Sequence, residues 1–272
     1  MAFAAPPNQP APPQQPAPVP QSQSQSQPGQ AQPQTQQTAH PGWSSHELRP
    51  AADVLRPPQA LALALILLLA LAALVNLFSA GVSAHLVSLM GDKAARPASV
   101  ADSALDLSDV LASVAGVLQT LSLLATMVVF LVWFHRVRVN GEILRPDAFT
   151  RTRGWAIGGW FIPVGNLFIP FRIAKEIWAA STQLGPDGSY RHVSTAPVTA
   201  WWTAWVASLF ADRVFDQMFK RAETAASLRD AWAVGLVCDL LTVAAAVLAA
   251  LFVRKLTSLQ HTKAVQGPYA QA

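Results

Sequence analysis

The chain has 272 residues, of which 52% are hydrophobic and only 12% are charged, about half the charged share of a soluble domain. This composition argues against a soluble cytosolic enzyme and against a wholly disordered chain, and it favours an integral membrane protein. The formal net charge of +4 then indicates basic loops beside a membrane, not a nucleic-acid partner. A single cysteine, Cys238, excludes an intramolecular disulfide framework and a cysteine-rich zinc site.

Residues 1–58 form a tail whose composition differs from that of the remaining chain. The tail holds most of the 21 prolines, separated mainly by Gln and Ser, and it has few large apolar residues. Such a segment buries too little apolar surface to offset the entropy lost on ordering, so we expect it to be disordered. Its proline runs favour polyproline II. The tail is either a ligand for a proline-recognising protein partner or a solvated spacer.

Four runs with few or no charges predict membrane-spanning helices. Each has about 20 mostly apolar residues, the length that crosses the hydrocarbon core of a bilayer. The predicted spans are residues 59–84, 110–134, 196–214 and 231–253. They lie within a membrane domain of residues 59–256, which is followed by a short C-terminal tail, residues 257–272.

A fifth uncharged stretch, residues 154–171, is interrupted by Pro163, Pro170 and four glycines. Each interior proline removes a backbone hydrogen bond, and in lipid the freed carbonyl groups need internal partners. A broken helix that lies in the interface, or dips in and returns, therefore fits this stretch better than a straight span. We expect an all-α, polytopic membrane four-helix bundle with this broken interfacial or re-entrant segment and a disordered N-terminal tail.

The distribution of Lys and Arg predicts the orientation of the bundle. If residues 154–171 do not cross the membrane, thirteen basic residues lie on the cytoplasmic side and six lie outside. If the stretch crosses, the numbers are eleven and eight. The first arrangement has the larger cytoplasmic excess, so we predict four spans with both termini in the cytoplasm.

The broken stretch and its flanks carry an unusual motif. Its parts are Trp133-Phe134-His135-Arg136-Val137-Arg138-Val139-Asn140, Arg153-Gly154-Trp155-Ala156, Trp160-Phe161-Ile162-Pro163-Val164-Gly165-Asn166-Leu167, Pro170-Phe171-Arg172, Glu176-Ile177-Trp178-Ala179-Ala180-Ser181 and Trp201-Trp202. Over roughly residues 61–252 the chain resembles a bacterial membrane family, domain of unknown function 4328. Members of that family often carry an aromatic residue where His135 or Val137 stands here. The resemblance implies a multi-pass domain in a bacterial plasma membrane and no known activity.

The broken stretch is the first candidate site. Pro163 and Pro170 lie seven residues apart, so a helical piece would present both on one face. Asn166 lies between them, and its amide can bond a freed carbonyl group or a polar ligand. With nearby arginines and tryptophans, the stretch either binds an anionic lipid headgroup or simply anchors the bundle as an interfacial hairpin. The candidate residues are Trp155, Trp160, Pro163, Asn166, Pro170, Arg172, Arg136 and Arg138.

The second candidate site is Asp239, the one ionisable residue well inside a predicted span. A carboxylate within a membrane is costly, which makes a functional role the first hypothesis. Asp239 either relays a proton or binds a cation, or it is hydrogen-bonded and holds helices together. The expected partners are the uncharged side chains of Asn76 on the first span and Gln119 on the second.

Motifs for catalysis, cofactor binding and metal binding are absent from the sequence. It has no glycine-rich phosphate loop, no His-Glu-x-x-His run and no Gly-x-Ser-x-Gly motif, and its histidines lack ligand spacing. We therefore expect no enzyme, no cofactor and no metal. The first hypothesis is a non-enzymatic membrane scaffold or adapter with a disordered cytoplasmic tail, as a monomer or a homo-oligomer. The alternative is a small transporter, channel or anionic-lipid-binding protein that uses residues 154–171 and Asp239.

Overall fold

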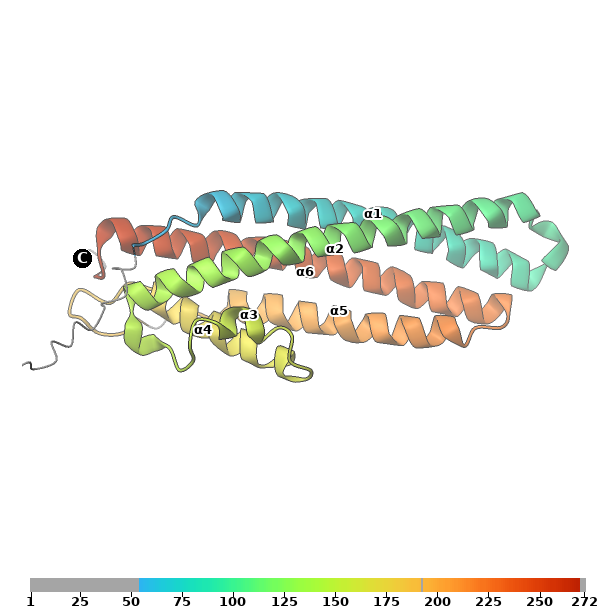
Figure 1. The fold of residues 1–272 in the computed structure, drawn as a ribbon. Coiled ribbons are helices and arrows are strands. Elements are labelled where there is room, and N and C mark those ends of the chain that lie inside the picture. Colours follow the sequence, from blue (N-terminus) through green and yellow to red (C-terminus); the bar gives the residue numbers. More distant parts are fainter. Residues whose placement is uncertain (1–53, 192, 270–272) are drawn as a thin grey trace, which may run out of the picture. The chain divides into compact units, whose positions relative to one another are not determined.

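The computed structural model describes residues 54–191 and 193–269, and these form a helical bundle without a β-strand (Figure 1). The all-α fold class predicted from the sequence is confirmed. The predicted disordered tail, residues 1–58, lies outside the described residues except for its last five, which lead into the first helix.

Four long helices make up the bundle, and two shorter helices and three 3-10 turns lie in the connections. The elements are α1 (Gln59–Ala95), η1 (Pro97–Ser99), α2 (Asp102–Leu144), η2 (Pro146–Ala148), α3 (Trp155–Gly158), η3 (Gly165–Leu167), α4 (Ile169–Ser181), α5 (Ala196–Lys220) and α6 (Ala225–Gln266).

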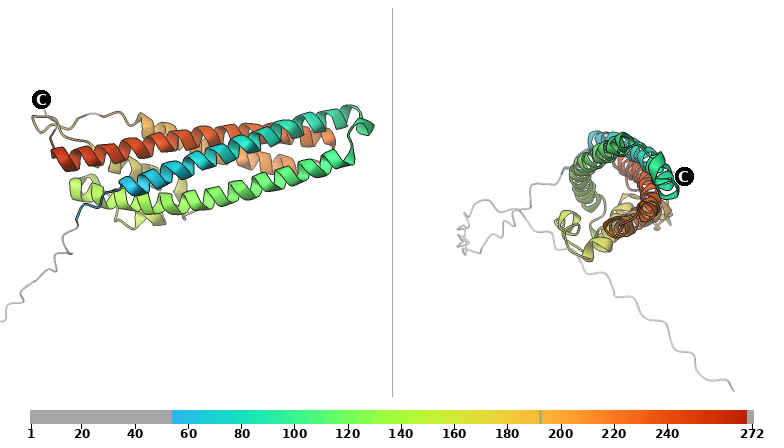
Figure 2. Two further views of the ribbon diagram at one scale, coloured as in Figure 1. Left: turned by 90° about the horizontal axis from the view of Figure 1, so that it is seen from above. Right: turned by 90° about the vertical axis from the view of Figure 1, so that its right-hand side faces the viewer.

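The long helices pack in the order α2, α1, α6, α5, because α1 contacts both α2 and α6 and α6 contacts α5. Neighbours in this row are antiparallel, as the short connections between α1 and α2 and between α5 and α6 require (Figure 1). The shorter α4 contacts α2, α5 and α6. The end-on view in Figure 2 shows α3 and α4 beside the outer helices of the row. The broken segment therefore links the two outer helices.

The start of α1 and the ends of α2, α4 and α6 meet at one end of the bundle (Figure 1). Gln59 at the start of α1 lies 3.1 Å from His261 near the end of α6, measured from Nε2 to Nδ1. Lys263 Nζ, also near the end of α6, donates a hydrogen bond of 2.8 Å to the carbonyl oxygen of Ala180 near the end of α4. Residues 145–195 thus leave α2 and reach α5 within the same half of the bundle, as a returning segment does.

Three helices within the described residues, α1, α2 and α6, are long and apolar enough to cross a membrane, with 37, 43 and 42 residues. They contain three of the four predicted spans. The fourth, residues 196–214, lies in α5, which has 25 residues but is less apolar, because tryptophans and the pair Asp212 and Arg213 dilute its aliphatic residues. α5 packs along α6.

α6 is longer than predicted and continues to Gln266, so most of the C-terminal tail expected at residues 257–272 is helical. Hydropathy does not reveal this extension because its buried residues are polar. Gln260 and Lys263 are only 2% and 4% exposed, and both hydrogen-bond to neighbouring elements.

The outer face of the bundle is unusually apolar. Along α1, Leu63, Leu67, Leu71 and Leu74 have exposed fractions of 60%, 62%, 49% and 64%. Monomeric soluble proteins rarely expose continuous apolar surface on this scale, whereas lipid solvates it readily. These exposed leucines support insertion of the bundle into a membrane.

Candidate functional site

A hydrogen-bonded network surrounds Asp239, which is 6% exposed within the apolar part of α6. Its Oδ2 accepts a hydrogen bond of 2.9 Å from Ser83 Oγ, and its Oδ1 accepts one of 2.8 Å from Gln119 Nε2. The Gln119 amide also donates to Asn76 Oδ1 at 2.9 Å. The structure therefore brings Asp239 together with both side chains that the sequence analysis expected as partners, and it adds Ser83.

The hydrogen-bonded network joins α1, α2 and α6, and a second carboxyl group, on α5, lies near it. Cys238 is buried beside Asp239, and Asp212 of α5 interacts electrostatically with both residues. Asn76 and Ser83 belong to α1, and Gln119 belongs to α2. Two carboxyl groups therefore lie close enough to influence each other where the four helices meet, although the sequence analysis found only one.

The chemistry available to Asp239 follows from its partners. Both of its oxygens accept hydrogen bonds from neutral groups, and none of the Lys and Arg side chains in the described residues forms an ion pair with it. A carboxyl group in this setting can hold helices together, exchange a proton or attract a small cation. Within residues 54–191 and 193–269, no group of three or more His, Cys, Asp and Glu side chains is placed to hold a metal ion.

Residues 154–171 form a broken helical hairpin with a tight turn at its tip. Gly165 N donates to Pro163 O at 2.6 Å across Val164, which has a φ of 62°. This is a γ-turn of the rare, strained kind, and positive φ is uncommon for a β-branched residue. The side chains of Phe161, Val164 and Phe168 around the turn are 61%, 70% and 62% exposed. The hairpin thus presents an apolar tip.

The turn separates two prolines that a continuous helix would have placed on one face. Pro163 is exposed, whereas Pro170 is buried in the first turn of α4, where its missing N–H costs no helical hydrogen bond. Asn166 is half-buried in η3, and its backbone N donates to Ile162 O at 2.9 Å. Its side-chain amide has no hydrogen-bond partner among the described residues, so the amide is available to a ligand.

Trp160 packs inside an aromatic cluster built by α2, α4, α5 and α6. Its ring centroid lies 5.3 Å from Phe130, 5.8 Å from Trp202 and 5.5 Å from Trp205. Each aromatic pair of this kind contributes about 0.5–1.5 kcal/mol beyond the burial of its area. Trp160 therefore fixes the broken segment to the bundle, and most of its ring is unavailable to line a headgroup site.

Arg138 is 1% exposed and is committed to internal contacts. Its guanidinium donates to Glu142 Oε2 at 2.7 Å and to the carbonyl oxygen of Arg151 at 2.6 Å, and it lies 3.6 Å from the centre of the Phe149 ring. These contacts hold the connection after α2 against the end of that helix. Arg138 thus positions the segment and does not offer its charge at the surface.

The other basic candidates are more accessible. Arg172 is exposed and Arg136 is half-buried, and neither forms an ion pair with an acidic group in the part of the chain that the structure describes. The guanidinium of Arg151 lies over the Trp155 ring, 5.1 Å from the centre of that ring. Among the candidates at the broken segment, the polar groups of Arg136, Arg172 and Asn166 are at least partly accessible and unpaired in the described residues, and the buried Trp160 Nε1 also has no hydrogen-bond partner there.

The chain enters α1 through a pair of hydrogen bonds to Asn140 near the end of α2. Arg56 N donates to Asn140 Oδ1 at 3.1 Å, and Asn140 Nδ2 donates to Arg56 O at 2.8 Å. Gln260 of α6 accepts a further bond from Asn140 at 3.3 Å. Asn140 and Gln260 are 3% and 2% exposed. These Arg56–Asn140 hydrogen bonds fix the point at which the N-terminal tail joins the bundle.

A sequence profile of the family described as "Domain of unknown function (DUF4328)" matches residues 96–258, more than half of the chain. The chain belongs to the DUF4328 family. Comparisons with curated proteins and with solved structures gave no match.

The DUF4328 match begins after α1, whereas the resemblance in the sequence started near residue 61. It covers α2, the broken segment, α5 and most of α6, so the helices that build the aromatic cluster lie within it. α1 lies outside the match even though it supplies Asn76 and Ser83 to the polar network.

Sequence reasoning missed several polar residues of this DUF4328 protein. Ser83 lies seven residues, two helical turns, after Asn76, so helical periodicity could have found it on the same face. Asn140 and Gln260 follow the apolar runs of their helices, where hydropathy treats polar residues as solvated. Only the packing of α2 against α6 reveals that both are buried.

Proposed function

We propose that this DUF4328 protein is a non-enzymatic membrane scaffold or adapter. In this proposal α1, α2, α5 and α6 cross a bacterial plasma membrane, and both termini lie in the cytoplasm. The tail, residues 1–58, recruits protein partners, and the helical bundle holds the tail at the membrane surface.

The observation that carries the proposal is the pair of Arg56–Asn140 hydrogen bonds. A tail that only filled space would need no fixed point of attachment. Here the main chain just before α1 is bonded to a buried side chain of α2, which is bonded in turn to Gln260 of α6. A partner bound to the tail would therefore be tethered to the bundle at a fixed point of attachment.

The orientation is supported by charge. The end of the bundle where α1 begins and α2 and α6 finish carries the larger share of Lys and Arg, as the cytoplasmic side of a membrane protein does. At the opposite end, Lys93 in the last turn of α1 and Arg96 just after it have several acidic residues nearby, which suits the outer side.

The proposal is tested by crosslinked pull-down from native membranes. The full chain is compared with a chain that begins at Val54 and so keeps Arg56 and its hydrogen bonds to Asn140. We expect specific partners with the full chain and their loss from the shortened chain. Equal sets of partners in both pull-downs would contradict recruitment by the tail.

A second candidate function is a small transporter or channel, and the network around Asp239 favours it. Hydrogen-bonded polar side chains of α1, α2 and α6 meet there, and Asp212 of α5 interacts electrostatically with Asp239. In proteoliposomes, a proton or cation flux that Asp239→Asn abolishes would support this function. Asp216→Asn is the control, because Asp216 is paired with Lys220 on the same helix at 2.8 Å. Flux that is unchanged in Asp239→Asn would exclude Asp239 from such a pathway.

The broken segment belongs to the same candidate through Asn166, whose side-chain amide is unpaired. Asn166→Ala should change flux or lipid retention without lowering the amount of protein in the membrane. If Asn166→Ala behaves as wild type in the same liposomes, the segment serves to anchor the bundle.

A further inference from the structure

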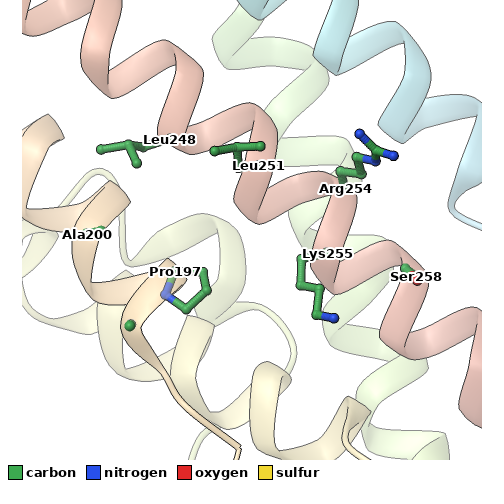
Figure 3. Close-up of a pocket in the computed structure, with 8 residues that line it drawn as sticks. Pro197, Ala200, Leu248, Leu251, Arg254, Lys255 and Ser258 are labelled. Atoms are coloured by element: carbon green, nitrogen blue, oxygen red, sulfur yellow. The ribbon is translucent and has the colours of Figure 1, made fainter.

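A groove of about 560 Å³ lies between the first turns of α5 and the second half of α6 (Figure 3). α5 contributes small side chains that leave the space open, and α6 contributes longer ones that border it. The groove is lined by Ala196, Pro197, Ala200, Leu248, Leu251, Arg254, Lys255 and Ser258.

One part of the groove is apolar. Leu248 and Leu251 project from α6 towards α5, where Pro197 and Ala200 face them (Figure 3). Leu251 is 54% exposed, so its side chain lacks a protein neighbour over half its surface. A surface of this kind is matched by a hydrocarbon chain.

The other part of the groove is basic. Arg254 and Lys255 directly follow the uncharged residues 240–253 of α6, both are exposed, and neither forms an ion pair within the described residues. No acidic residue occurs in residues 240–266 of α6 or in residues 196–211 of α5. The positive charge at this part of the groove is therefore not neutralised by either helix that lines it.

The apolar and basic parts follow each other along one face of α6. Leu248, Leu251, Lys255 and Ser258 are spaced by three or four residues, which places them in one row on a helix. Lys255 lies about 10 Å beyond Leu248 along the helix axis, at a rise of about 1.5 Å per residue. Figure 3 shows Lys255 extending beside the start of α5, whereas Arg254 points to the other flank of α6.

We propose that this groove binds one anionic glycerophospholipid. An acyl chain lies between Ala200 and Leu251, and the phosphate is bound by the Lys255 ammonium group and the Ser258 hydroxyl. Arg254 adds positive potential beside the headgroup, and the N-terminal end of the α5 dipole adds to it. The inference rests on the membrane insertion in the proposed function but not on the scaffold role.

The test measures lipid retention by native mass spectrometry of the full chain purified in detergent. Dioleoyl phosphatidylglycerol and dioleoyl phosphatidylcholine are added separately, since they differ in headgroup charge and share their acyl chains. We expect wild type to retain more phosphatidylglycerol. Lys255→Gln should lower that retention about fivefold, the factor for about 1 kcal/mol per basic residue near a lipid surface.

Two further variants separate charge from shape. Lys93→Gln removes a lysine at the opposite end of the bundle and should leave retention unchanged. Ala200→Phe fills the apolar part, keeps every charge and should lower retention of both lipids. Lys255 is exposed and makes no hydrogen bond in the described residues, so Lys255→Gln should elute at the wild-type position on size exclusion.

Any one of four results would overturn the inference. The first is equal loss of phosphatidylglycerol in Lys255→Gln and Lys93→Gln, and the second is unchanged retention in Ala200→Phe. The third is displacement of the lipid by soluble glycerol 3-phosphate, which would indicate a phosphate site without an acyl chain. Equal retention of the two lipids by wild type would also exclude the site, but it would leave the insertion and scaffold role of the bundle intact.

Discussion

Arg138 shows at the scale of single residues how the bundle accommodates a buried charge. A buried guanidinium is costly unless a counter-charge and hydrogen-bond acceptors surround it. Glu142 supplies the counter-charge, and it also accepts a hydrogen bond of 2.9 Å from Arg153 Nε. Burial raises the pKa of Glu142, but the hydrogen bonds from Arg153 and Arg138 outweigh this, so the pKa lies below its ordinary value. Glu142 lies two helical turns beyond Phe134, where the predicted span ends.

This arrangement predicts a pH-dependent effect of Glu142→Gln. The variant leaves the Arg138 charge without its partner and should cost about 1–3 kcal/mol of stability at pH 7. Because the pKa of Glu142 is lowered on folding, its contribution is fully present above the ordinary value of 4.5 and is lost as the pH falls through the lowered pKa.

The measurement is the apparent melting temperature of the purified protein in detergent between pH 3 and pH 7. We expect the difference between wild type and Glu142→Gln to shrink as the pH falls below 4.5. Asp216→Asn, which removes an exposed ion pair, should change the melting temperature little at any pH. A difference that stays constant across the range would show that the Glu142 charge contributes nothing.

At the scale of elements, the broken segment depends on close packing between α3 and α4. A Cβ atom at Gly159 would lie 2.7 Å from Ile169 Cγ2 and 2.9 Å from the carbonyl oxygen of Trp155. The neighbouring Gly158 has nothing within 4 Å of such an atom. Gly159 therefore allows the close approach of the two helices, and its neighbour does not take part.

We accordingly predict that Gly159→Ala lowers stability by about 1–3 kcal/mol, the usual cost of overpacking. Gly158→Ala should leave stability unchanged or raise it by up to about 1 kcal/mol, since alanine favours a helix over glycine. Limited proteolysis within residues 145–195 reports the loosening directly. Equal protease resistance of the two variants would contradict the proposed role of Gly159.

At the scale of the whole bundle, the decisive feature is that residues 145–195 return to the end from which they leave. α1 and α2 then form one antiparallel pair, α5 and α6 form the other, and α4 links the outer helices. If this bundle crosses a membrane, the connection that contains Ser189 lies on the side where α1 begins and α6 ends.

This topology is tested with single cysteines in a Cys238→Ala background. Ser189→Cys should resist an impermeant thiol reagent added to intact cells, because the proposed orientation puts it in the cytoplasm. Ser99→Cys, in η1 between α1 and α2, should react, because it lies at the opposite end of the bundle. Labelling of Ser189→Cys in intact cells would mean that residues 154–171 cross the membrane.

The sequence by itself determined the helical class and the position of the apolar helices. Runs of uncharged residues bounded by charges are a local signal, because lipid or a buried core requires them residue by residue. Asp239, Asn76 and Gln119 were identified for the same reason, since a polar side chain inside an apolar run is conspicuous. The proline and glycine content of residues 154–171 likewise predicted a break, though not the γ-turn that separates Pro163 from Pro170.

Only the tertiary structure decided which side chains are engaged in internal contacts and which remain accessible to a ligand. Trp160 and Arg138 were candidates for either a lipid-headgroup site or a simple anchor, and internal contacts engage the ring of one and the guanidinium of the other. Conversely, Arg254 and Lys255 counted in the sequence only as cytoplasmic charges. Arg254 and Lys255 border a groove because the facing residues of α5 are small. Burial and pairing depend on neighbours across the bundle, and a single sequence does not specify those neighbours.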